Sequence, residues 1–187
     1  MAIFLKTEEE IELMRAANLL VGSTLGELAK HIRPGVSTAY LDKIADTFIR
    51  DHGAVPTFKG FPNPYGRPFP ASICTSVNAC VVHGVPSEDQ ILKDGDIVSI
   101  DCGTLLDGFN GDSAYTFPVG EISEELKTLL LTTKESLYKG IEQAVHGNHV
   151  GDIGQAVEDY CEQRGYGVVR ELTGHGIGRE MHEEPQI

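Results

Sequence analysis

A β-hairpin signal at Asp107-Gly108 constrains the fold more than any other feature of this sequence. The dipeptide favours a two-residue hairpin turn, and it lies between strand-like runs at 97–106 and 109–119. A two-residue loop also fixes the register, because the residues on either side of it pair directly. We therefore expect an antiparallel pair of strands in this region.

The expected register brings two carboxylates together. If Leu106 pairs with Phe109, Asp112 lies opposite Gly103. Side chains two residues apart share one face of a strand, so Asp101 and Asp112 are diagonal neighbours. Two buried like charges are costly unless a cation neutralises them. The pattern therefore indicates a divalent metal site, and a solvated strand face is the alternative.

Histidines provide further candidates for this site. Glycines surround His175 and allow the backbone to approach a ligand closely. A neutral imidazole beside two carboxylates suits a first-row transition metal. His182 follows in the same glycine-rich segment, and His83 lies in a Val-His-Gly-Val run. We interpret these three histidines as candidates for one site.

Helices are expected around the strands. A capping box at Thr7 and apolar residues at helical spacing predict a first helix that extends toward Pro34. The other expected elements are helices at 37–53, 123–145 and 150–164, strands at 73–77, 80–82 and 167–169, and a proline-rich surface loop at 55–70.

Two segments of the chain have the same layout. Gly35–Gly53 and Gly147–Gly165 have equal length and matching apolar positions. This match indicates two structurally related halves. The alternative is that any two amphipathic helices ending in glycine would match equally well.

Charge and cysteine content limit the classes of partner. The net charge of −13 repels phosphate backbones and anionic lipid surfaces. The N-terminal residues have neither the basic region nor the apolar run of a signal or membrane segment. The four cysteines form no C-x-x-C pair. We expect a cytoplasmic protein without disulfide or structural zinc, and without nucleic acid or membrane as a direct partner.

Three blocks of sequence, in order and with the expected spacing, resemble type I methionine aminopeptidase. They are 72–84, the aspartate hairpin, and 174–185. The resemblance covers essentially the whole chain and implies an α+β pita-bread fold, in which pseudo-twofold halves surround a curved antiparallel sheet. We expect one catalytic-type domain over 1–187, with an N-terminal half at about 1–120, the start of a second half at about 121–187, and the last strands lacking.

The resemblance also implies roles for individual residues. Asp101, Asp112 and His175 match three of the family's five ligands for two divalent cations (Co, Mn, Fe, Zn or Ni), and Asp112 matches the ligand that bridges them. His83 and His182 match catalytic histidines that face the substrate. The two glutamate ligands of the family lie beyond Ile187, so we expect the chain as given to be inactive.

A methionine side chain needs a dry, polarisable pocket. The residues that we expect to bind substrate are His83, His182, Cys74, Phe61, Phe69 and Met181. The alternative for the last four is a purely structural place in the core.

The implied reaction is removal of the initiator methionine from nascent proteins with a small second residue, by a metal-activated water. The expected partners are N-terminal methionine peptides and the ribosome. One alternative is a proline-directed relative, which shares the fold but carries a further N-terminal domain; only about seventy residues precede Ser72. Another is a peptide-binding scaffold without catalysis, against which Asp101, Asp112 and His175 argue.

Overall fold

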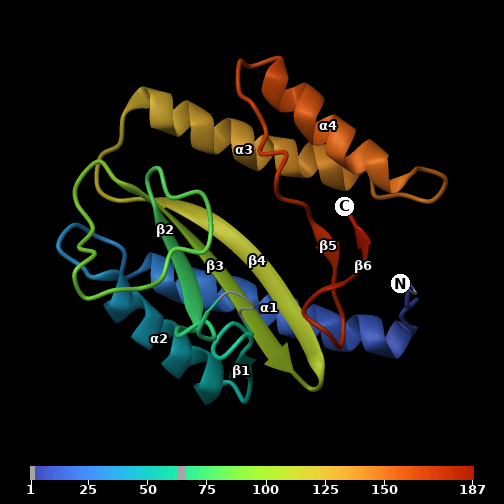
Figure 1. Cartoon of the computed structure of the whole chain (residues 1–187), viewed down its shortest axis with the longest axis horizontal. Coiled ribbons are helices and arrows are strands. Elements are labelled where there is room, and N and C mark those ends of the chain that lie inside the picture. Colours follow the sequence, from blue (N-terminus) through green and yellow to red (C-terminus); the bar gives the residue numbers. More distant parts are fainter. Residues whose placement is uncertain (1–2, 63–65) are drawn as a thin grey trace. The chain divides into compact units, whose positions relative to one another are not determined.

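The chain folds into two units (Figure 1). The sheet unit comprises residues 5–122 and 177–181, and the helix-pair unit comprises residues 3–4, 123–176 and 182–187. The structure is a computed structural model that describes residues 3–62 and 66–187. Across these residues, no helix combines the length and the apolar character that crossing a membrane requires.

A four-stranded antiparallel sheet forms the centre of the sheet unit. Its middle strand is β3 (Ile97–Leu106), which pairs along one edge with β4 (Phe109–Pro118). Along its other edge it pairs with β2 (Ile73–Val77) and with the short β1 (Val55–Pro56). The strand with the most neighbours therefore carries Asp101.

The register of the β3–β4 hairpin is the predicted one. Leu106 lies opposite Phe109, and Gly103 lies opposite Asp112. The two turn residues between the strands have positive φ values of 50° and 81°. Positive φ at both positions is what a type I′ turn requires, and it explains the Asp-Gly sequence.

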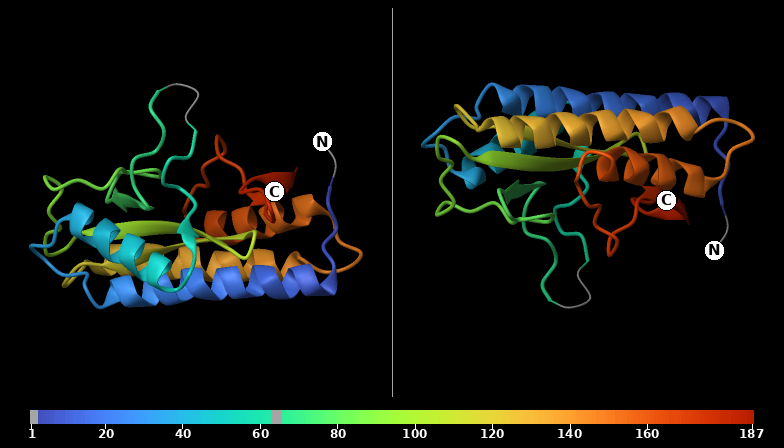
Figure 2. Two further views of the ribbon diagram at one scale, coloured as in Figure 1. Left: turned by 90° about the horizontal axis from the view of Figure 1, so that it is seen from below. Right: turned by 90° about the horizontal axis from the view of Figure 1, so that it is seen from above.

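Two helices cover one face of the sheet. α1 (Glu8–Ala29) and α2 (Thr38–Asp51) lie on the same side of it (Figure 2). The capping box at Thr7 is confirmed, because its Oγ1 accepts the amide of Glu10 at 3.2 Å and the Glu10 carboxylate accepts the amide of Thr7 at 3.0 Å. The core between helices and sheet contains Val21, Leu25, Leu28, Leu41, Ala45, Ile49, Ile73, Val98, Ile100 and Cys102.

The helix-pair unit contains α3 (Glu124–Gln143) and α4 (Val150–Glu162), which pack together. Gly140 permits this packing, because a Cβ there would lie 3.0 Å from a methyl carbon of Val157. The unit also contains β5 (His175–Gly176) paired with β6 (Glu183–Gln186).

The glycines at the ends of the two segments with the same layout, 35–53 and 147–165, share one backbone conformation. Gly35, Gly53, Gly147 and Gly165 have φ between 78° and 98°, a region that glycine enters without steric cost. Gly35 and Gly53 flank α2, and Gly147 and Gly165 flank α4. The two helices are therefore bounded in the same way, which supports the interpretation of two related halves.

The strands predicted at 80–82 and 167–169 are absent. After β2 the chain turns at Asn78, whose φ is 51°, and the amide of Cys80 donates to Val77 O at 3.1 Å. This turn carries Val81 away from the ladder, and its side chain is exposed. The β-branched residues that predicted the strand thus lie in a loop. The short β1, β5 and β6 were not predicted.

Thr75 gives a test of core packing in β2. It has the same orientation as the core residue Ile73 and is 4% exposed, yet its Oγ1 has no hydrogen-bond partner within the described residues. A buried polar group without a partner costs about 1–3 kcal/mol. We expect Thr75→Val to raise the free energy of unfolding by about 1 kcal/mol in a urea titration.

Thr116→Val is the matched control for Thr75→Val. The hydroxyl of Thr116 lies 2.8 Å from that of Ser99, so its removal should lower the free energy of unfolding. If the free energy of unfolding of Thr75→Val is no higher than that of the parent chain, the buried Thr75 hydroxyl does not destabilise the fold, and the prediction is wrong.

Candidate functional site

Asp101 and Asp112 lie on the sheet face opposite α1 and α2. Along β3 the side chains alternate, so the core residues Ile100 and Cys102 face the helices and Asp101 faces away from them. On β2, Cys74 lies directly opposite Asp101. The predicted convergence of the two aspartates with Cys74 on one face is therefore present in the sheet unit.

The two carboxylates interact strongly. Burial, followed by the negative charge of Asp112 and a hydrogen bond to its side chain, raises the pKa of Asp101 well above its ordinary range. Both side chains are half-buried. Without a cation, the raised pKa of Asp101 favours a proton shared between the two carboxyl groups. A fully solvated strand face does not fit these observations.

A divalent cation fits this donor set. Carboxylate oxygens are ligands for divalent metals, and the positive charge would replace the shared proton. Throughout residues 3–62 and 66–187, no group of three or more His, Cys, Asp or Glu side chains is arranged to hold a metal ion. The sheet unit thus supplies Asp101 and Asp112, and the predicted third ligand, His175, belongs to the helix-pair unit.

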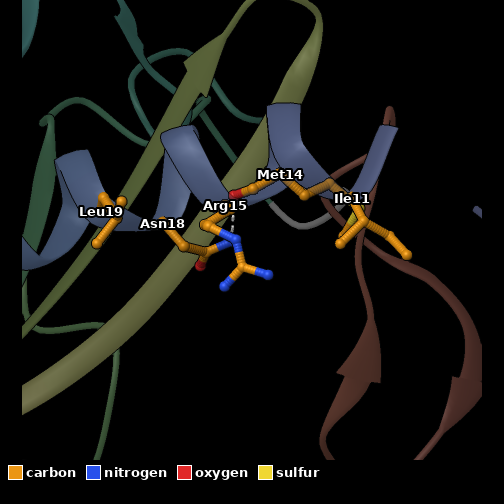
Figure 3. A pocket seen from close by; sticks show the side chains of 5 residues that line it. All are labelled: Ile11, Met14, Arg15, Asn18 and Leu19. Atoms are coloured by element: carbon orange, nitrogen blue, oxygen red, sulfur yellow. Dashed lines mark hydrogen bonds between the residues drawn. The ribbon is translucent and has the colours of Figure 1, made fainter. Parts of the chain in front are cut away.

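The backbone of Asp112 is fixed by α1. Its amide donates to Asn18 Oδ1 at 3.2 Å, and Asn18 Nδ2 donates to Met14 O at 2.9 Å. Asn18 also lines a shallow pocket of about 410 Å³ on α1 (Figure 3). The other residues of this pocket are Ile11, Met14, Arg15 and Leu19. The pocket contains none of the predicted site residues.

His175 and His182 lie together in the helix-pair unit. Their ring centroids are 4.3 Å apart, in an edge-to-face arrangement. The Nδ1 atom of His175 lies 2.9 Å from Gly176 O, and because a carbonyl only accepts, Nδ1 carries the proton. In the neutral ring this leaves the lone pair on Nε2, which is the form that binds a metal. A Cβ at Gly176 would lie 2.6 Å from Glu184 O, so only glycine fits there.

His83 ends the loop that follows β2. Its side chain is exposed, and its φ of 59° lies in the left-handed region, which is uncommon for residues other than glycine. Such strained conformations gather at functional sites. The conformation supports a functional role for His83 without defining that role.

Cys74 is suited to an apolar pocket wall. It is 5% exposed, and burial, followed by the charges of Asp101 and Asp112, raises the pKa of its thiol to about 12. The thiol therefore stays neutral and polarisable at physiological pH. Met181 is buried in the same unit, at 7% exposure. All four cysteines are free.

Phe61 and Phe69 lie on opposite sides of one loop. The amide of Phe69 donates to Phe61 O at 2.9 Å, and the amide of Gly60 donates to Phe69 O at 2.8 Å. Both rings are half-buried. The structure thus brings the two predicted pocket residues together at the base of the loop, whose residues 63–65 lie outside the described part of the chain.

Two aspartates of α2 anchor the start of β2, just before Cys74. Asp42 Oδ1 accepts the amide of Ser72 at 2.7 Å, and Asp46 Oδ1 accepts the Ser72 hydroxyl at 2.7 Å. Burial raises the pKa of Asp46, but hydrogen bonds, including those from Arg50 and Lys59, outweigh it and hold that pKa at about 2. The Asp46 carboxylate is therefore ionised at physiological pH, whereas burial raises the pKa of Asp42 above its ordinary value.

Asn110 is a buried residue that the sequence patterns do not predict to be part of the site. It is 3% exposed and donates its backbone amide to Gly178 O at 2.8 Å and its Nδ2 to Arg179 O at 2.9 Å. Its Oδ1 accepts the hydroxyl of Thr57 at 3.0 Å. These bonds dock the segment 177–181, which includes Met181, onto the sheet. An asparagine inside a predicted strand is unusual, and that signal was available in the sequence.

Comparison with known proteins decides the family. The sequence pattern of metallopeptidase family M24 matches residues 12–187. The chain belongs to this family. The methionine aminopeptidase of Clostridium acetobutylicum is 53% identical over 185 residues, which are 99% of this chain and 72% of that protein.

Solved structures of an aminopeptidase and a dipeptidase share the fold. The methionine aminopeptidase from Rickettsia prowazekii has a TM-score of 0.93 and 42% identity, covering 100% of this chain and 73% of that one. The Xaa-Pro dipeptidase from Bacillus anthracis has a TM-score of 0.79 and 28% identity, covering 97% and 48%. The expected resemblance to methionine aminopeptidases and the pita-bread fold are confirmed. Membership of M24 makes the chain a metallopeptidase, a hydrolase that uses divalent metal.

Proposed function

We propose that this chain is the catalytic part of a metal-dependent aminopeptidase that removes N-terminal methionine from nascent proteins when the second residue is small. The observation that carries the proposal is the pair of half-buried, interacting carboxylates, Asp101 and Asp112, beside the neutral thiol of Cys74. The identity of its relatives supports the methionine specificity. Its setting is the cytoplasm, where nascent chains at the ribosome are the substrates.

The metal ligands in this proposal are Asp101, Asp112 and His175, with Asp112 shared between two divalent cations. The identity of the metal, among Co, Mn, Fe, Zn and Ni, stays open. When bound, such cations supply an activated water and polarise the scissile carbonyl. The two carboxylates would hold the cations, because each offers two oxygens and their mutual repulsion in this half-buried place favours a neutralising positive charge.

The remaining site residues bind and orient the peptide. His83 and His182 donate hydrogen bonds to the scissile peptide, which favours its tetrahedral form. The methionine side chain enters a pocket lined by Cys74, Phe61, Phe69 and Met181. A neutral thiol, two rings and a thioether offer polarisable contacts and no charge, which suits a thioether ligand.

The domain assignment is part of the proposal. Residues 1–187 represent one catalytic-type domain built from two related halves, and they match 72% of the length of the Clostridium acetobutylicum relative. The chain carries three of the five ligands that the resemblance implies. We call "extended form" a protein in which this chain is continued after Ile187 by the residues of that relative that lie outside the match.

Peptide specificity tests the proposed function. We expect the extended form, loaded with Mn²⁺ or Co²⁺, to release methionine from Met-Ala-Ser and to leave Ala-Pro-Ser intact, because the pocket accepts methionine at the first position. A chromatographic assay of free amino acids measures both reactions. Met-Leu-Ser is the control for the small second residue and should be cleaved more slowly. Preferential cleavage of Ala-Pro-Ser would instead assign the chain to the proline-directed M24 enzymes.

A further inference from the structure

Strand β2 holds both polar backbone groups of Gly84. The amide of Gly84 donates to Ser76 Oγ at 3.1 Å, and the amide of Thr75 donates to Gly84 O at 2.8 Å. Gly84 therefore lies against the edge of β2 that β3 does not occupy. The residue before it is His83.

The docking of Gly84 on β2 leaves no space for a side chain. A Cβ at Gly84 would lie 2.2 Å from Thr75 O and 3.0 Å from the Cα of Ser76. Neither neighbour is able to move away easily, because both atoms belong to the backbone of a paired strand. The position of Gly84 is thus fixed by contact as well as by hydrogen bonds.

The loop before His83 is also fixed at its other end. Asn78 Oδ1 accepts the amide of Ile97 at 3.0 Å, and Asn78 Nδ2 donates to Asp96 Oδ1 at 2.8 Å. His83 itself has a φ of 59°, a conformation that costs free energy for a residue with a Cβ. The hydrogen bonds at both ends of the loop offset this cost.

The hydroxyl of Ser76 points to the face of the sheet that carries the aspartates. Ser76 and Cys74 are two residues apart on β2, so their side chains share a face, and Cys74 lies opposite Asp101. Ser76 is 4% exposed, which shields its hydrogen bond from water. Its hydroxyl therefore draws the Gly84 amide toward that face.

We propose that Ser76 is a positioning residue for His83. Its hydroxyl holds the Gly84 amide, the Gly84 amide holds the left-handed backbone of His83, and that backbone aims the imidazole at the scissile peptide. This inference rests on the proposed function, which makes His83 a hydrogen-bond donor to the substrate. No step of the chemistry passes through Ser76 itself.

A double-mutant cycle in the extended form tests this role. We expect Ser76→Ala to lower kcat for Met-Ala-Ser about tenfold or more, with KM changed less than about twofold, since a misplaced group acts mainly in the transition state. In a His83→Ala background the same substitution should change kcat less than about twofold, because the group that it positions is absent. Ser76→Thr retains the hydroxyl and should restore most of the activity.

Ser99→Ala is the matched control. Ser99 lies opposite Ser76 in the sheet, and its hydroxyl contacts Thr116 rather than the His83 loop. We expect its kcat to equal that of the parent. The proposal would be overturned if Ser76→Ala lowered kcat by the same factor in the parent and in the His83→Ala background. It would also be overturned if Ser76→Ala did not lower kcat in the parent.

NMR of the 187-residue chain separates this inference from the proposed function. The Cα and Cβ chemical shifts of His83 report its backbone conformation without any need for activity. We expect Ser76→Ala to shift them toward values typical of negative φ, and Ser99→Ala to leave them unchanged. If His83→Ala has the activity of the parent, the proposed role of His83 as a donor to the substrate is wrong. Chemical shifts of His83 that still change in Ser76→Ala would nevertheless support the role of Ser76 in positioning the backbone of His83. Shifts that do not respond overturn it.

Discussion

Replacing Asp112 by alanine in the extended form should reduce kcat/KM for Met-Ala-Ser by about a thousandfold or more. Metal catalysis supplies several kcal/mol of transition-state stabilisation, and each ~1.4 kcal/mol is a factor of ten in rate. Asp112 is proposed to bridge both cations, so its loss affects each of them. The release of methionine measures the rate, and elemental analysis of the purified protein should show a lower metal content.

Asp107→Asn is the matched control for Asp112→Ala. Asp107 belongs to the same hairpin, and its side chain is exposed at the turn. Asparagine also tolerates the positive φ of 50° found there. The control should keep the activity and metal content of the parent. A folded Asp112→Ala variant with normal activity would remove the basis for the whole metal-site assignment.

The β3–β4 hairpin shows how much of the site the sequence predicts. Its register depends on a local feature, the Asp-Gly turn, and on strict alternation along each strand. Those two rules suffice to bring Asp101 and Asp112 to one face. Helix ends at Thr7 and Ser37 were likewise predictable, because a cap and its helix are neighbours in sequence.

The loop that carries His83 shows where sequence reasoning fails. Val81 and Val82 have high strand propensity, so the pattern predicted a strand. The structure instead forms a turn at Asn78 and docks Gly84 on β2. This arrangement depends on space beside Thr75, a contact that local sequence does not reveal.

Asn110 shows a second kind of failure. Its importance depends on the carbonyls of Gly178 and Arg179, which lie 68 and 69 residues away in sequence. Propensity and periodicity describe neighbours along the chain, so they give no partner for a buried amide in a strand. The same applies to β5 and β6, which are too short for a pattern.

Helix α3 exposes several large apolar side chains. Leu131, Tyr138, Ile141 and Val145 are between 54% and 57% exposed in or just after this helix. Apolar surface of this kind favours association. We therefore expect this face of α3 to favour self-association of the 187-residue chain, as sedimentation velocity would show.

The 187-residue chain itself should release methionine from Met-Ala-Ser at less than about a thousandth of the rate of the extended form. The three implied ligands that this chain carries would hold at most one cation, and loosely. The proposed chemistry needs two cations and a proton acceptor beside the activated water, and the loss of either contribution would lower the rate by factors of ten. The assay compares both forms at equal concentration with Mn²⁺ or Co²⁺. Asp112→Ala in the extended form is the control for residual activity. Similar specific activities for the two forms would show that the glutamates are dispensable, and that the proposed two-metal chemistry is wrong.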